Sequence, residues 1–288
     1  MANSISAAPD VPDAPDAPDA PNAPNAPNAP NALQDLVDAN HILFHEGVLD
    51  AFGHASMRCA DDPGRFLLSR SMAPALVAAA DVFAFDLDGN PVADAAGNTI
   101  DGQPPAVFLE RFIHSAIYRA RPDVMAVVHS HSPAVIPFGV ARNVTLRPIC
   151  HMSGFLARGA PVFEIRDSAG PGSDLLIRDA ALGQALAARL GTANVVLMRG
   201  HGATVAADSL RQAVYCAIYT EKNARLVLEA RRLGDIEYLT DEEGLAAEAT
   251  NAKQVNRAWD LWKRLARQTA TAWCGSPTSL TGTRGDTR

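Results

Sequence analysis

The sequence predicts a layered α/β domain with a mixed or antiparallel central sheet. Short apolar runs typical of strands alternate with longer amphipathic stretches, and the two kinds do not follow a strict strand–helix–strand order. Hydrophobic residues make up 48% of the 288 positions, which is enough to bury a substantial core in one large domain or two small ones.

The expected helices have apolar residues every three or four positions, which gives each helix one apolar face. They cover residues 33–47, 105–120, 208–231 and 242–267. The expected strands are short apolar runs bounded by turn-forming residues. They cover residues 53–58, 66–69, 82–86, 124–129 and 195–199. Asp88-Gly89-Asn90 predicts a turn into one further strand.

A proline-rich segment precedes the first helix. Residues 9–32 repeat Pro-Asp-Ala and then Pro-Asn-Ala, and proline at every third position blocks helix and sheet hydrogen bonding. With almost no apolar side chains, this segment cannot offset its ordering entropy, so we expect residues 1–32 to be a disordered tail. Residues 271–288 are expected to form a flexible C-terminal tail. One catalytic domain is therefore expected over residues 33–270.

Charge and cysteine content exclude several classes of protein. The formal net charge is -7 at pH 7, so no broad basic face for nucleic acid is expected. No apolar run reaches the roughly 18–20 residues that span a bilayer, and no secretory signal is visible. The four cysteines are widely separated, without a Cys-x-x-Cys spacing. We therefore expect a cytoplasmic protein that contacts neither membrane nor nucleic acid.

Two histidines at the end of an apolar run are the first candidate metal ligands. Residues 127–131 read Val-Val-His-Ser-His, and alternate residues of a strand point the same way, so His129 and His131 project side by side. Two surface histidines would give the same pattern, so the pair alone leaves both interpretations open. His201 adds a third imidazole, between two glycines that allow a sharp turn after another apolar run. Three histidines can hold a divalent ion and leave a position open for substrate.

Glu110 is the candidate acid–base group. We expect it in the helix before the His-x-His strand, where its apolar neighbours Phe108 and Leu109 indicate a buried helix start. A carboxylate beside a metal ion serves as a ligand or moves a proton, although an isolated glutamate on a helix is more often a solvated surface residue. Burial beside Phe108 would raise the pKa of Glu110, and a metal ion would lower it.

Together these motifs resemble the class II aldolase/adducin family. The resemblance rests on Glu110, on His129-Ser130-His131 and on Gly200-His201-Gly202, and it extends over most of residues 33–265. It implies a three-layer α/β/α domain around a mostly antiparallel sheet, and a homotetramer with active sites at subunit interfaces. It also implies that the three histidines bind one divalent ion per subunit, Zn²⁺ or Mn²⁺, and that the glutamate moves a proton. The adducin branch, a binding protein without an intact metal site, is the non-catalytic alternative.

Two departures from the family pattern narrow the reaction. Members that cleave sugar phosphates have Gly-Asn in the early turn and Ser-Ser before the glutamate. Here the turn is Gly53-His54, and the residues before the glutamate are Phe108 and Leu109. Apolar side chains in these places would leave phosphate oxygens without hydrogen-bond donors, whereas an apolar wall suits an aromatic ring.

Residues 53–58 and 69–74 are similar to the decarboxylase branch of the family, which acts on dihydroxyphthalate and hydroxypyridine dicarboxylate. The resemblance implies a metal-dependent lyase that decarboxylates an ortho-hydroxylated aromatic carboxylate or dicarboxylate. The guanidinium of Arg70 suits a planar carboxylate, although a surface salt bridge is an equal interpretation. A metal-dependent aldolase acting on an unphosphorylated hydroxy-keto compound is the second interpretation of the same site. The expected substrate contacts are Arg70, Ser69, Ser71 and His54.

Overall fold

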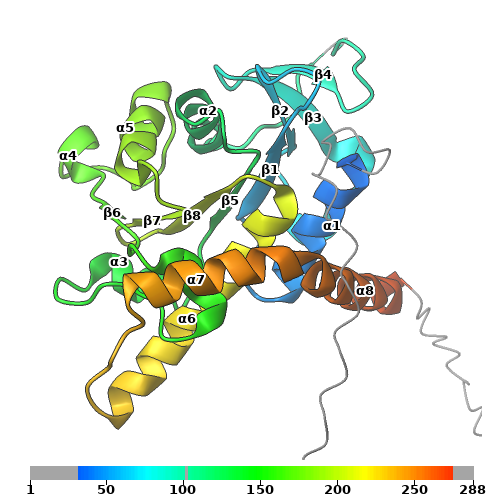
Figure 1. Ribbon diagram of the computed structural model, residues 1–288. Helices are drawn as coiled ribbons and strands as arrows, with labels where there is room; N and C mark the ends of the chain where they lie inside the picture. The colour runs from blue at the N-terminus through cyan, green and yellow to red at the C-terminus, as the bar shows by residue number, and fades with distance from the viewer. Residues whose placement is uncertain (1–31, 101–102, 275–288) are drawn as a thin grey trace, which may run out of the picture.

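The computed structural model describes residues 32–100 and 103–274, which form one sheet with helices on both faces (Figure 1). The sheet has the strand order β4-β3-β2-β1-β5-β8-β7-β6, and all neighbours are antiparallel except β6 and β7. The expected α/β class with a mostly antiparallel sheet is confirmed. The strands are β1 His54–Arg58, β2 Arg65–Ser69, β3 Val82–Asp86, β4 Pro91–Asp94, β5 Ala126–Ser130, β6 Val162–Phe163, β7 Val195–Met198 and β8 Gly202–Ala207.

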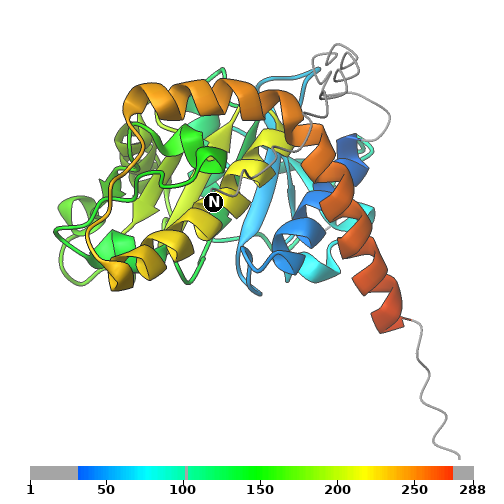
Figure 2. The same ribbon diagram turned by 60° about the horizontal axis from the view of Figure 1, so that its bottom comes forward.

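The helices form the two outer layers (Figures 1 and 2). α1, α6 and α8 pack on one face of the sheet, and α2 and α5 pack on the other. Side chains of each strand alternate between these faces: in β5, Val128 joins the core beneath α1 and α6, and Val127 joins the core beneath α2. The helices are α1 Ala32–His45, α2 Arg111–Ala120, α3 Ile136–Val140, α4 Arg166–Ala169, α5 Ala180–Leu190, α6 Leu210–Leu233, α7 Asp241–Asn251 and α8 Val255–Cys274, with short 3₁₀ turns η1 Pro74–Leu76, η2 Ala79–Asp81, η3 His151–Leu156 and η4 Ala252–Gln254.

The helix before β5 is shorter than the sequence predicts. α2 begins at Arg111 rather than at residue 105, and residues 104–108 have no regular secondary structure. A residue that precedes proline avoids the helical region, so the prolines at 104 and 105 disfavour a helix that begins before residue 105. The irregular backbone of residues 106–108 has no such local cause. The buried side chain of Phe108 therefore belongs to an irregular segment packed against the sheet. Glu110 occupies the N-cap of α2 rather than a position inside the helix.

The single helix expected over residues 242–267 is two helices. α7 ends at Asn251, the turn η4 follows, and α8 begins at Val255 in a new direction (Figure 2). The Asn251 side-chain amide donates to the carbonyl of His151 at 2.8 Å and so fixes the junction against η3. Residues 252–254 are Ala, Lys and Gln, which are all good helix formers, so the sequence gives no sign of the break.

Some of the structure falls outside the sequence-based expectations. The pattern predicts neither β6, α5 nor β8, and β8 is built largely from small residues with little strand preference. α8 continues to Cys274, beyond the domain end expected at residue 270. Of the tails proposed over residues 1–32 and 271–288, residue 32 belongs to α1 and residues 271–274 belong to α8, and the rest lies outside the described residues. Within the described part of the chain, no helix is both long and apolar enough to cross a membrane.

The antiparallel order gathers several strand ends at one edge of the sheet. β1 and β8 start at this edge, and β2, β5 and β7 end there. His54 begins β1, His129 lies near the end of β5, and His201 precedes β8. Residues from distant parts of the sequence therefore meet at this edge.

An ionic cluster holds α8 against α1. Asp38 is 2% exposed, and its carboxylate accepts hydrogen bonds from Nε and Nη2 of Arg267 at 3.0 and 2.9 Å. Lys263 Nζ lies 2.9 Å from the same carboxylate. Both cations stay partly exposed, so they keep much of their hydration while they satisfy the buried anion.

Replacing Asp38 with alanine should lower the free energy of unfolding by about 1–3 kcal/mol, because α1 and α8 lose the buried carboxylate that joins them. Denaturant unfolding followed by circular dichroism measures the change. Glu229→Ala removes an exposed ion pair with Arg232 and is the control, with an expected change of about 0.5 kcal/mol or less. Equal losses in the two variants would contradict this account of the α1–α8 contact.

Candidate metal centre

Four side chains converge at the edge where β5 and β7 end. His129 and His131 come from the end of β5, His201 from the turn between β7 and β8, and Glu110 from the N-cap of α2. One ligand atom from each lies within 4.8 Å of the other three. The Nε2 atoms of His131 and His201 are 3.1 Å apart, and Glu110 Oε2 lies 3.5 Å from His129 Nε2 and 3.4 Å from His201 Nε2. The structure thus brings together the four residues predicted as metal ligands and acid–base group.

A close backbone approach sets His201 beside His131. Gly200 has a φ of +67°, in the left-handed region that favours glycine. A Cβ atom on Gly202 would lie 2.0 Å from the carbonyl oxygen of Ser130. β8 reaches β5 at this point only because residue 202 has no side chain.

The donor atoms fit a divalent cation. The His129 side chain is 0% exposed, and burial lowers the pKa of His129 against the opposing effect of Glu110. The His129 Nε2 atom is buried and makes no hydrogen bond. This unpartnered nitrogen lies close to two further imidazole nitrogens and a carboxylate. Together the four groups are a set of ligands that zinc and similar ions take.

Glu110 is ionised. Burial by itself would raise the pKa of Glu110, but the neighbouring imidazoles of His129 and His201 lower it well below its usual range. The sequence points to burial and a metal ion as the two opposing effects on this pKa. The structure adds the two imidazoles, which favour the carboxylate. A resting carboxylate can bind a cation or accept a proton, and it can donate a proton only after accepting one.

In two of the histidines, Nδ1 lies within hydrogen-bonding distance of a neighbouring oxygen atom. Nε2 of each ring is then the nitrogen available to a cation. His131 Nδ1 lies 3.1 Å from Asp50 Oδ2, and His129 Nδ1 lies 3.3 Å from Thr204 Oγ1. A carboxylate on the far nitrogen fixes the tautomer and orientation of a ligating imidazole. Asp50 is not among the residues predicted from the sequence. In the sequence, only its place just before the Gly53 turn marks Asp50. In the structure, Asp50 Oδ1 accepts a hydrogen bond from the Gly53 N–H at 3.0 Å.

One loop holds both His201 and Glu110. The Leu175 carbonyl lies 3.0 Å from His201 Nδ1, and the Ile177 N–H donates to Glu110 Oε1 at 3.0 Å. Leu175 has a φ of +72° and is the only non-glycine residue with a positive φ in the described chain. Such backbone strain costs about 1–3 kcal/mol and persists only where the surroundings enforce it. No sequence pattern reveals this loop, because it acts through backbone atoms.

The segment of Ser69, Arg70 and Ser71 lies at the same edge of the sheet, where β2 ends. Arg70 is 44% exposed, and its Nε donates to Asp81 Oδ1 at 2.7 Å, so the salt bridge considered from the sequence is present. Ser69 is buried in the sheet. The Ser71 N–H donates to the carbonyl of Ala106 at 2.7 Å, which joins this segment to the stretch before Glu110. Contact of these three residues with substrate stays a prediction.

His54 lies beside the centre without supplying an atom to the four-residue cluster. It is the β1 partner of His129 in the antiparallel register, and the two ring centroids are 5.1 Å apart. Phe108 packs on its other side at 4.4 Å. The residue is 1% exposed. Its role toward substrate also stays a prediction.

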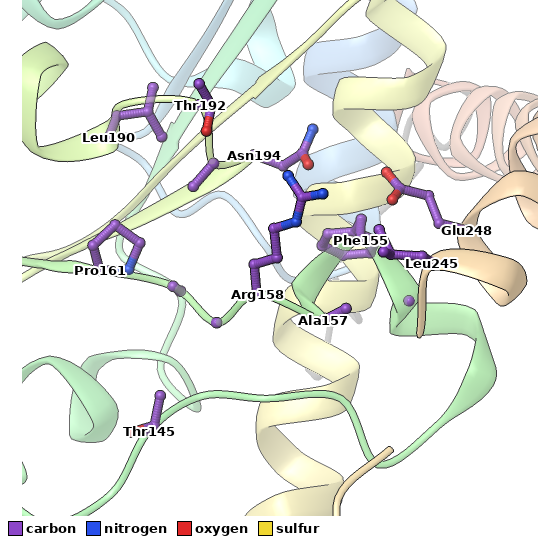
Figure 3. Close-up of a pocket in the computed structure, with 14 residues that line it drawn as sticks. Thr145, Phe155, Ala157, Arg158, Pro161, Leu190, Thr192, Asn194, Leu245 and Glu248 are labelled. Atoms are coloured by element: carbon purple, nitrogen blue, oxygen red, sulfur yellow. The ribbon is translucent and has the colours of Figure 1, made fainter. Parts of the chain in front are cut away.

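A surface pocket lies away from this centre (Figure 3). Arg158, Asn194 and Glu248 line it together with apolar side chains such as Phe155. Asn194 precedes β7, so the pocket is at the edge of the sheet opposite to the edge that carries the histidines. It contains none of the candidate ligands.

Replacing Asp50 with asparagine should weaken Zn²⁺ binding about 10–100-fold, because the carboxylate that orients His131 is lost while the turn keeps an acceptor. Competition with a chelator of known affinity measures the change. Asp62→Asn is the matched control, since Asp62 accepts the N–H of Gly64 in a similar turn and does not contact the centre. Equal affinities in the Asp50 variant and the wild type would remove Asp50 from this role.

Comparisons with known proteins agree with this geometry. The family model described as Class II Aldolase and Adducin N-terminal domain matches residues 34–228. The chain is 37% identical to Decarboxylase tropJ of Talaromyces stipitatus, over 81% of this chain and 92% of that protein. It is 33% identical to 3,4-dihydroxyphthalate decarboxylase of Arthrobacter keyseri, over 68% of this chain and 77% of that protein.

A solved structure supports the fold. L-fuculose 1-phosphate aldolase from Glaciozyma antarctica aligns with a TM-score of 0.65 at 19% identity, over 82% of this chain and 90% of that chain. Its likeness concerns the fold alone. The family model, the curated relatives and this fold agree with one another: the chain belongs to the class II aldolase/adducin family.

Proposed function

We propose that the protein is a divalent-metal-dependent lyase that decarboxylates an aromatic carboxylate with a hydroxyl on the neighbouring ring carbon. The observation that carries the proposal is the intact set of three histidines and one carboxylate around the unpartnered Nε2 of His129. Likeness to two kinds of decarboxylase over most of the chain favours loss of carbon dioxide as the reaction. The intact ligand set argues against the non-catalytic adducin alternative.

The surroundings of the centre favour an aromatic substrate over a phosphorylated one. Phe52 and Leu109 are 71% and 56% exposed, and they directly precede the Gly53 turn and Glu110. Both offer apolar surface to a flat ring. Neither offers the hydrogen-bond donors that a phosphate dianion needs.

The residues of the chain account for the proton transfers. A bound divalent ion would supply Lewis acidity toward the oxygens of the substrate. Glu110, as a carboxylate, accepts the proton of the substrate hydroxyl and then returns it to the ring carbon that bears the leaving carboxylate. The bond from that carbon to the carboxylate breaks, carbon dioxide leaves, and a C–H bond replaces it. The Ile177 N–H occupies Oε1, so Oε2, on the side of the histidines, carries the proton.

We expect the Zn²⁺- or Mn²⁺-loaded protein to release carbon dioxide from 3,4-dihydroxyphthalate or a related hydroxylated aromatic carboxylate. Removal of the ion with a chelator should abolish the reaction, and re-addition should restore it. Carbon dioxide and the decarboxylated product are measured together. Cleavage of an unphosphorylated hydroxy-keto compound, with no carbon dioxide from any aromatic acid, would replace decarboxylation with the aldolase reaction.

Glu110→Gln should lower turnover by a factor of about 10²–10⁴, because the amide cannot carry the proton but can still accept the Ile177 N–H. The three histidines should retain the metal ion. Metal content and rate are measured on one preparation, with Glu248→Gln as the control for a half-buried glutamate away from the centre. A variant with full metal content and full rate would exclude Glu110 from the mechanism, and loss of both metal and rate would make it a ligand only.

A further inference from the structure

A chain of buried polar side chains runs from the centre into the layer between the sheet and α2. His54 Nδ1 lies 2.7 Å from His114 Nε2, His114 Nδ1 lies 2.6 Å from Ser56 Oγ, and Ser56 Oγ lies 2.8 Å from the Tyr118 hydroxyl. All four side chains are buried. None supplies an atom to the four-residue cluster, so the metal ligands alone do not explain why this interior is polar.

The hydrogen bonds of this chain restrict where its protons lie. Each hydrogen bond needs one donor and one acceptor, so an imidazole that accepts at one ring nitrogen carries its only N–H on the other. Burial also lowers the pKa of His114 to about 3 and raises the pKa of the Tyr118 phenol. Donation can run through the whole chain in one of two directions.

The Tyr118 end selects the direction. Among the described side chains, Ser56 is the only hydrogen-bond partner of the Tyr118 hydroxyl. If Ser56 donated to Tyr118, the phenol O–H would be left without a side-chain acceptor in a buried site, and an unmade buried hydrogen bond is unfavourable. Tyr118 therefore donates to Ser56, and Ser56 donates to Nδ1 of His114. The one N–H of His114 is then on Nε2, where it donates to His54.

His54 is left with its proton on Nε2. Because His54 Nδ1 accepts from His114, the N–H of this neutral ring points away from the α2 layer. Within the described chain, Nε2 has no hydrogen-bond partner. Among the described side chains, the polar atoms that are both fully buried and without a hydrogen-bond partner are Asn40 Oδ1 and His129 Nε2. His54 Nε2 is not among them. Nε2 therefore keeps some accessible surface, and the centroid of the His54 ring lies 5.1 Å from that of the His129 ring.

We infer that His54 donates a hydrogen bond from Nε2 to an oxygen of the substrate at the metal centre, and that Tyr118, Ser56 and His114 hold it in the tautomer that can donate. The inference rests on the proposed function, whose substrates present carboxylate and hydroxyl oxygens. A donor fixed in this way favours an anionic oxygen and repels no metal ion, since it carries no charge. His54 touches substrate, and the other three are positioning residues.

Two substitutions of His54 separate this role from a structural one. In His54→Gln the amide N–H₂ reaches about as far as Nε2, and in His54→Asn the amide lies near the place of Nδ1 and can still bond to His114. Salicylate binding to the Zn²⁺-loaded protein is measured by calorimetry, with metal content determined for each variant. We expect His54→Gln to stay within about threefold of the wild type and His54→Asn to bind about tenfold more weakly or worse. Equal affinities in the two variants, or the reverse order, would overturn the inference.

Neutron diffraction from deuterium-exchanged crystals of the Zn²⁺-loaded protein tests the tautomer without any substrate. We expect deuterium on Nε2 of both His54 and His114, and the Ser56 hydroxyl directed at His114. Deuterium on Nδ1 of His54 would overturn the inference. Failure of the wild type to bind salicylate would count against the aromatic substrate class, and the neutron structure would then decide on its own whether His54 presents a donor.

Discussion

The contact between Gly202 and the Ser130 carbonyl is the constraint on which the centre depends. It lets the start of β8 lie against the end of β5, and the register of that pair then fixes several groups at once. His129 stands opposite Thr204, the residue whose hydroxyl approaches its Nδ1. The turn before Gly202 brings the ring of His201 to within 3.1 Å of His131. The same strand pair therefore places the three candidate histidine ligands and one of the groups that would orient them.

Glu110 completes the centre from a different layer, and its charge reflects where α2 begins. A residue inside the helix would lie among backbone groups that are already paired, whereas the N-cap lies at the positive end of the helix dipole. That end favours a carboxylate, as do His129 and His201, while burial opposes it. The irregular segment before α2 thus matters chemically, because a helix that began at residue 105 would remove Glu110 from the positive end of α2.

Much of the site can be predicted from the sequence, because its histidines lie in local sequence patterns that indicate where their side chains point. His129 and His131 share a strand face by the alternation of side chains, and the glycines around His201 mark the sharp turn that exposes it. The position of Glu110 relative to its helix does not follow, because the apolar run of residues 107–109 resembles a buried helix start and the prolines just before it are also compatible with one.

What stays hidden in the sequence are contacts between distant parts of the chain that use ordinary residues. Asp50 reaches His131 across the fold, and the break between α7 and α8 depends on the contact of Asn251 with His151. The strands β6 and β8 are short or composed of small residues, so their pairing rather than their composition makes them strands. The buried chain from His54 to Tyr118 likewise appears only when β1 and α2 are packed together.

The loop through Leu175 has an evolutionary consequence. Its backbone touches the imidazole that would hold the ion and the carboxylate that would carry the proton, although it contains neither. A substitution that relaxes the left-handed residue shifts both groups together, so selection on this loop cannot adjust ion preference and proton affinity separately. Lineages that diverge here would be expected to change both properties in a single step, while their ligand residues stay the same.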